Sequence, residues 1–76
     1  MSRNSRSDAP RKAPRQARAQ ATVEAILRAT AHILRTKGWD ACNTNAVAKR
    51  AGVSIGSLYQ YFPSKEALLA ALAERH

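Results

Sequence analysis

The chain has 76 residues, which allows one small domain, and 45% of them are hydrophobic, an ordinary share for a folded protein. Its formal charge of +8, from 13 Lys and Arg against 5 Asp and Glu, favours a polyanionic partner, either nucleic acid or an acidic membrane surface. A single cysteine excludes an internal disulfide framework, no apolar run approaches the ~20 residues that span a bilayer, and the start lacks the apolar core of a secretory signal, so we expect a cytoplasmic protein.

Residues 1–16 are predicted to form a disordered basic arm. They consist mainly of Ser, Arg, Pro and Ala without periodicity, and such segments bury too little apolar surface to fold. Six of the 13 cations precede residue 19, and the one acidic residue there is Asp8. Branched aliphatic side chains first appear at Val23, so the folded domain is expected to span residues 17–76. The arm either neutralises phosphates or is a solvated tail that aids solubility.

A first helix is predicted from about Arg18 to Lys37. Residues spaced three and four apart share one face of a helix. On this face lie Val23, Ile26, Leu27, Thr30, Ile33 and Leu34. Gly38 closes the helix in a left-handed conformation. Trp39 is interpreted as a lid over the core, and His32, outside the apolar face, as an exposed surface residue.

The second helix is predicted to be short, from Thr44 to about Ala51. Asn43 is a good N-cap residue because its side chain can accept a hydrogen bond from a free backbone N–H of the first turn. Gly52 then stops the helix and provides a tight turn. Cys42, just before the cap, is interpreted as a small buried hydrophobic residue in preference to a redox sensor.

A third and a fourth helix follow, each with a serine cap. Ser54 caps the third helix, predicted over Ile55–Phe62, and Pro63 prevents its continuation. Ser64 caps the fourth helix, whose apolar residues are Leu68, Leu69 and Leu72. The sequence therefore predicts an all-α fold, a three-helix helix-turn-helix bundle with the start of a fourth helix.

The third helix is predicted to have a polar outer face. On a helical wheel, Leu58 and Phe62 point inward. The opposite side carries a glycine, an amide, a hydroxyl and a phenol, from Gly56, Gln60, Ser57 and Tyr59. The amide can bond base edges, the hydroxyl and the phenol can reach phosphates, and glycine permits close backbone approach. Ile55 could touch a thymine methyl. The same face would also suit a small helical bundle that is merely polar outside.

The stretch AVAKRAGVSIGSLYQYFPSKEALLAAL closely resembles the DNA-binding domain of the TetR family of bacterial transcriptional regulators. The upstream run AILRATAHILRTKGW is similar to the family's opening helix, so the resemblance extends from about Gln20 to the end. Its specific part is GVSIGSLYQYFPSKEALL, which combines turn, cap, groove-facing residues and next helix. The resemblance implies sequence-specific binding of double-stranded DNA by a transcriptional regulator, most often a repressor.

The resemblance also implies roles for individual residues. Positions that contact DNA in the family are occupied here by Thr44, Asn45, Ile55, Gly56, Ser57, Tyr59, Tyr61 and Lys65. The three that open the third helix face bases, and the others lie near phosphates. Gln60 is a further candidate DNA contact, because the helical wheel places it on the outer face of the third helix. Gly52 supplies the turn.

The chain departs from the family pattern in three ways. Asn45 stands where Arg is common, and Ala46 replaces the usual acidic residue, so no capping box forms at that helix start. Family members normally continue into a helical domain that dimerises and binds an effector, whereas this chain ends at His76. We expect a monomeric fragment or truncated product, whereas a full-length member would form a homodimer on a palindromic operator.

Other classes of protein are less well supported by the sequence. A protein-interaction module would use the Ala- and Leu-rich fourth helix, but would favour an apolar outer face on the third helix. A cationic membrane-surface peptide needs a helix with a basic and an apolar face, whereas many of the arginines precede the predicted helices. Two histidines, one cysteine and no paired carboxylates indicate no enzyme, cofactor or metal.

Overall fold

The computed structural model of the chain describes residues 14–75. In order, its helices are α1 (Pro14–Lys37), α2 (Thr44–Ala51), α3 (Ile55–Tyr61) and α4 (Lys65–Glu74). No strand occurs among these residues, so the predicted all-α fold is confirmed. None of these four helices is long and apolar enough to cross a membrane.

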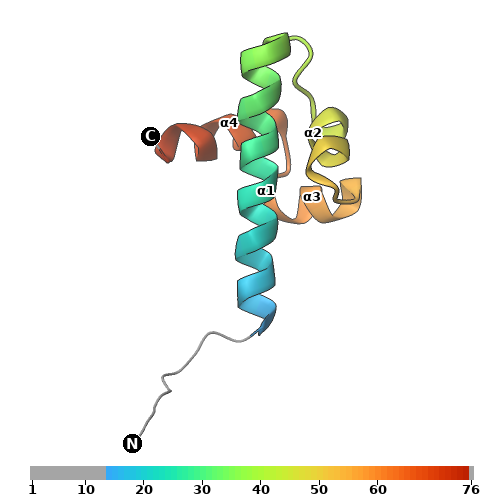
Figure 1. The fold of residues 1–76 in the computed structure, drawn as a ribbon, viewed down its shortest axis with the longest axis vertical. Coiled ribbons are helices and arrows are strands. Elements are labelled where there is room, and N and C mark those ends of the chain that lie inside the picture. Colours follow the sequence, from blue (N-terminus) through green and yellow to red (C-terminus); the bar gives the residue numbers. More distant parts are fainter. Residues whose placement is uncertain (1–13, 76) are drawn as a thin grey trace, which may run out of the picture.

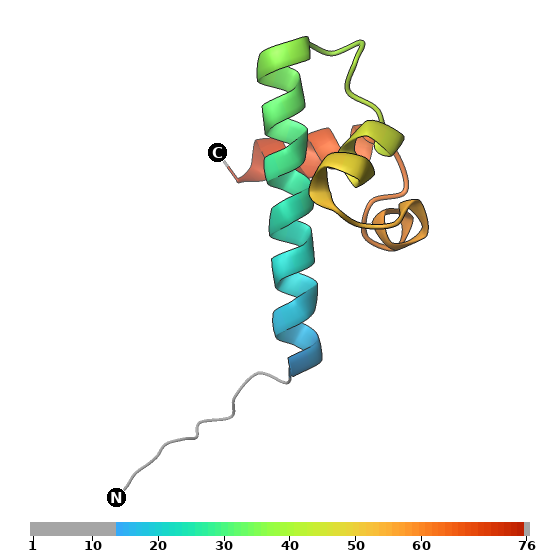
Figure 2. The ribbon, with the colours of Figure 1, turned by 45° about the vertical axis from the view of Figure 1, so that its right-hand side comes forward.

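The long helix α1 organises the domain (Figure 1). The short helices α2 and α3 lie on one side of it, and α4 crosses behind it. The turned view in Figure 2 keeps α2 beside the middle of α1 and looks almost along the axis of α3. In both views the first turns of α1 extend beyond the other three helices.

The start of α1 differs from the prediction. The helix begins at Pro14, four residues before the expected Arg18, so the predicted boundary of the arm at residue 16 falls inside it. Proline is well tolerated in a first helical turn, and the Ala, Arg and Gln that follow are good helix formers. The prediction relied on apolar periodicity, which begins later. The remainder of the predicted arm, residues 1–13, lies outside the described residues.

The predicted inner face of α1 is confirmed. Ile26, Leu27 and Ile33 are buried, and the hydroxyl of buried Thr30 donates to the Ile26 carbonyl at 2.8 Å, which satisfies it. The other helices and the loop before α2 complete the core with Cys42, Val47, Ala48, Leu58, Phe62 and Leu68. The prediction that Cys42 is a buried hydrophobic residue is confirmed, and burial raises the pKa of its thiol.

All three predicted side-chain caps are present. The Asn43 side chain accepts from the Ala46 amide at 2.8 Å, and the two serine caps open α3 and α4 with bonds of 3.1 Å. Helix α3 ends one residue earlier than predicted, because Phe62 is extended (φ −138°). Pro63 disfavours helical geometry in the residue before it. The Phe62 amide still donates to the Leu58 carbonyl, at 2.8 Å, and its ring is buried.

Two predictions about the surface of α1 and its following loop are corrected. Trp39 is no core lid, because about half of it (51%) is exposed. It follows Gly38, whose φ of 90° turns the chain away from the α1 axis. His32 lies outside the apolar face as predicted, but it is half-buried, since α2 packs beside it and Arg50 lines the same hollow.

Candidate nucleic-acid interface

A tight turn of residues 52–54 joins α2 to α3. Gly52 adopts a left-handed conformation (φ 78°), which L-residues with a side chain rarely adopt. The amides of Gly52 and Val53 both donate to the Ala48 carbonyl, each at 3.0 Å. Val53 packs against the core beyond the turn. The turn therefore holds α3 in a defined direction relative to α2 through backbone bonds and packing together.

Helix α3 separates buried and exposed residues as the helical wheel predicts. Leu58 is fully buried, whereas the opposite face with Gly56 and Gln60 is exposed. Two tyrosines flank this face, and Tyr59 and Tyr61 are 46% and 38% exposed. The residues from Ile55 to Tyr61 include no charged side chain. The exposed face of α3 can thus donate and accept hydrogen bonds without a net charge of its own.

Tyr59 is linked to the start of α2. Its phenol oxygen lies 3.0 Å from the Thr44 hydroxyl oxygen, and either group can be the donor. This hydrogen bond brings together two candidate phosphate contacts that are 15 residues apart in the chain. Exposed Asn45 follows Thr44 in the first turn of α2, where no acidic residue is present to repel an anion.

Ser57 has a structural contact besides its candidate role. Its amide donates to the Ser54 hydroxyl at 3.1 Å, and the Ser54 hydroxyl in turn donates to the Ser57 hydroxyl at 3.0 Å. The Ser57 hydroxyl accepts in this pair, so its own proton remains available to a ligand. Ser57 is half-buried, beside exposed Ile55 and Gly56. The helix cap consequently restricts the Ser57 side chain.

Lys65, at the first position of α4, contacts Trp39 in the loop after α1. Its Nζ donates to the Trp39 carbonyl at 2.7 Å and lies 3.8 Å from the centroid of the indole ring. A cation over an aromatic face is attracted by the ring quadrupole. Trp39 thus positions Lys65 at this end of the domain. The two residues are 26 positions apart, and no local sequence signal pairs them.

A short polar helix, presented by a preceding short helix through a glycine turn, is the arrangement of a helix-turn-helix DNA-binding domain. The comparison with protein families agrees with this class. Residues 26–72 match the family described as bacterial regulatory proteins, tetR family. The chain belongs to the TetR family, and the match covers α2, the turn and α3 completely.

Several curated relatives are similar to the chain over about 50 residues. The HTH-type transcriptional repressor KstR of Mycolicibacterium smegmatis is 48% identical over 50 residues, which are 66% of this chain and 24% of that protein. The uncharacterized HTH-type regulator YvdT of Bacillus subtilis is 41% identical over 49 residues, 64% of this chain and 25% of the relative. The nucleoid occlusion factor SlmA of Mannheimia succiniciproducens is 42% identical over 50 residues, 64% of this chain and 23% of the relative.

The chain thus spans about a quarter of the length of these relatives. No solved structure matches it.

Proposed function

We propose that residues 14–75 bind double-stranded DNA in a sequence-specific manner and that the protein acts as a transcriptional repressor. The observation that carries the proposal is the exposed, uncharged and polar face of α3, held by a helix-turn-helix. The family supports DNA binding, and the name of the relative KstR supports repression. A regulator of this kind works where the chromosome is, in the bacterial cytoplasm.

In this proposal α3 enters the major groove. An α-helix with its side chains is about 10–12 Å in diameter, which fits a groove about 12 Å wide. The base-reading residues are Ile55, Gly56, Ser57 and Gln60. Gln60 can form two hydrogen bonds with adenine, and Ile55 can contact a thymine methyl.

A second group of residues would fix the register of α3 by contacting phosphates. Its members are Thr44, Asn45, Tyr59, Tyr61 and Lys65. The Thr44–Tyr59 hydrogen bond supports a shared phosphate for these two hydroxyls, since both oxygens lie at the start of α2. Lys65 supplies the charge that α3 lacks. Such contacts orient the domain and carry no sequence information themselves.

Repression would follow from occupancy of a promoter site. One domain reaches one half-site, and two copies joined in the whole protein would reach both halves of a palindromic operator. Linking two heads makes the second contact intramolecular and raises the avidity by roughly 10²–10⁴.

Selection of bound sites from random duplexes, at two salt concentrations, tests the proposal. We expect one preferred half-site motif to be enriched at both salts, because hydrogen bonds to base edges depend less on salt than phosphate contacts do. The chain with Gln60→Ala serves as the matched control, because this exposed substitution should alter the motif at one position and leave the fold intact. Enrichment of no motif, or identical motifs from both chains, would contradict the proposed assignment of α3.

A further inference from the structure

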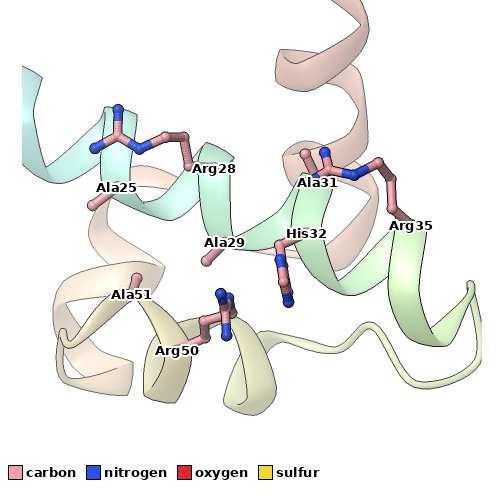
Figure 3. A pocket seen from close by; sticks show the side chains of 8 residues that line it. All are labelled: Ala25, Arg28, Ala29, Ala31, His32, Arg35, Arg50 and Ala51. Atoms are coloured by element: carbon pink, nitrogen blue, oxygen red, sulfur yellow. The ribbon is translucent and has the colours of Figure 1, made fainter.

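A hollow of about 470 Å³ lies between α1 and α2. Four basic side chains border it, those of Arg28, His32, Arg35 and Arg50, and small alanine side chains leave the space open. We call this site the α1–α2 groove. Figure 3 shows His32 extending from α1 towards α2 and Arg50 lying on α2 below Ala29 of α1. Arg28 and Arg35 lie further along α1 on either side of His32, and their guanidinium groups are directed away from α2.

Within the described part of the chain, the lining of the groove contains basic side chains and no acidic one. No Asp or Glu lines it, and Arg28, Arg35 and Arg50 have no hydrogen-bond or ion-pair partner among residues 14–75. A neighbouring hollow shares His32 and Arg50 and adds Lys37 and Lys49, again without an acidic residue from this part of the chain. Glu24, one helical turn before Arg28, pairs with Arg75, and these two residues border a separate hollow together with Arg28.

The surroundings of His32 disfavour the charged form of its imidazole. Burial, and then the nearby charges of Arg50, Arg35 and Lys37, lower the pKa of its imidazole. A bound anion would reverse the sign of the local field and favour the imidazolium. Arginine forks match the geometry of phosphate oxygens with two parallel hydrogen bonds. The residue types present therefore suit a multivalent oxyanion.

We propose that the α1–α2 groove binds a small phosphorylated molecule, with Arg50 and His32 contacting the phosphate oxygens and Arg28 and Arg35 adding positive charge at its border. This site goes beyond the proposed DNA contacts, since all residues that line it belong to α1 and α2 and none is a candidate DNA contact. The candidate DNA contact Thr44 is the first residue of α2, and Arg50 lies about 9 Å further along the helix axis.

The dimensions favour a small molecule over a duplex. Small-molecule sites have volumes of about 300–1,000 Å³, a range that includes the groove. A ligand that bridges Arg50 and His32 would connect α1 to the last turn of α2, which leads directly into the Gly52 turn and α3. Occupancy of the groove would therefore stabilise the presentation of α3 without covering its exposed face.

Titration of the 76-residue chain with pyrophosphate, without DNA, tests this proposal. The imidazole proton resonances report on the site, and His32→Asn distinguishes the His32 signal from that of His76. We expect a saturable shift of the His32 signal and a rise in the pKa of His32 on binding. Arg50→Gln should weaken binding about tenfold or more, since it removes a hydrogen bond to a charged ligand. Lys49→Gln, which removes the same charge from the adjacent residue outside the groove, should change the affinity less than threefold.

Arg50→Lys keeps the charge but loses the planar fork, and should bind with intermediate affinity. Equal thermal unfolding midpoints for the variants would show that the comparison concerns binding. Equal losses for the variants Arg50→Gln and Lys49→Gln would mean diffuse attraction and overturn the proposal, as would a shift that does not saturate. A duplex added as competitor should leave the bound pyrophosphate in place. Displacement of pyrophosphate from His32 by the duplex would assign the groove to the DNA backbone and also overturn the proposal.

Discussion

The α3 face and the α1–α2 face of this domain differ in charge. Between Ile55 and Tyr61 α3 carries no charged side chain, and its residues Gly56 and Gln60 are exposed. The paired hollows on α1 and α2 are bordered by Arg28, Arg35, Lys37, Lys49 and Arg50. An uncharged polar face on α3 and a cationic face on α1 and α2 are thus separate regions of the surface. Substitutions in the two regions should therefore have different kinds of effect.

The largest expected effect comes from the residue that attaches α3 to the core. Leu58→Ala should lower the free energy of unfolding by about 2–5 kcal/mol, because it removes a fully buried side chain and leaves a cavity. Urea denaturation measures this loss. Leu69→Ala, at a half-buried position in α4, should cost less and serves as the control. A smaller loss for Leu58 than for Leu69 would mean that α3 is not anchored by this side chain.

Substitution of Gln60 should alter specificity. Gln60→Ala should reduce discrimination at one base pair of the preferred site by about 1–3 kcal/mol and leave the slope of affinity against salt unchanged. Competition between the preferred duplex and its single-base variants gives this difference. Because Gln60 is exposed, the unfolding midpoint should stay the same. A uniform loss over all duplexes would indicate a phosphate contact instead.

The turn between α2 and α3 depends on backbone conformation alone. No atom lies within 4 Å of the position that a Cβ on Gly52 would occupy, so a substitution there meets no steric clash with neighbours. Gly52→Ala should still destabilise the domain by about 1–2 kcal/mol, because its φ of 78° is left-handed. Gly52→Asn should cost less, since Asn tolerates this conformation better. Thermal unfolding of the two variants compares them directly, and equal stability of the Ala variant and the unsubstituted chain would refute the explanation.

Removal of the Lys65 charge should affect all duplexes alike. Lys65→Gln should lower the salt slope of DNA binding by about 0.9, the value for one neutralised phosphate, with no change in base preference. Lys65→Arg keeps the charge and controls for its loss. The fluorescence of Trp39, the single tryptophan, should shift in Lys65→Gln because the ammonium group leaves its ring. An unaltered salt slope would remove Lys65 from the phosphate contacts.

The smallest expected effect is a dependence of stability on pH. The pKa of His32 is lowered in the folded chain, so the unfolded chain binds a proton more readily. The free energy of unfolding should consequently fall as the pH drops from the ordinary pKa of histidine, 6.5, towards the lowered pKa of His32 in the folded chain. Urea midpoints at about pH 7.5 and about pH 5.5 measure the fall, and His32→Asn should reduce it. A rise in stability on acidification that depends on His32 would contradict this sign.

Local sequence signals predicted much of this domain correctly. The bounds of α2, the three capping residues and the left-handed Gly52 agree with the structure, because each depends on hydrogen bonds or dihedral preferences within about four residues. Exposure of Gly56 and Gln60 followed from helical periodicity once α3 was located. The candidate DNA contacts themselves remain predictions from resemblance and exposure.

Tertiary packing decided the features that link distant parts of the chain. Trp39 was predicted to cover the core, but it lies exposed against Lys65, and Arg50 and His32 border the same α1–α2 groove. Neither pair has a periodicity or spacing that a sequence pattern can reveal. These contacts depend on how whole helices pack, and that packing is set by burial of residues such as Ile26, Val47 and Leu58 together. Local patterns therefore determined the helices and their ends, whereas the summed burial of the core determined which side chains meet.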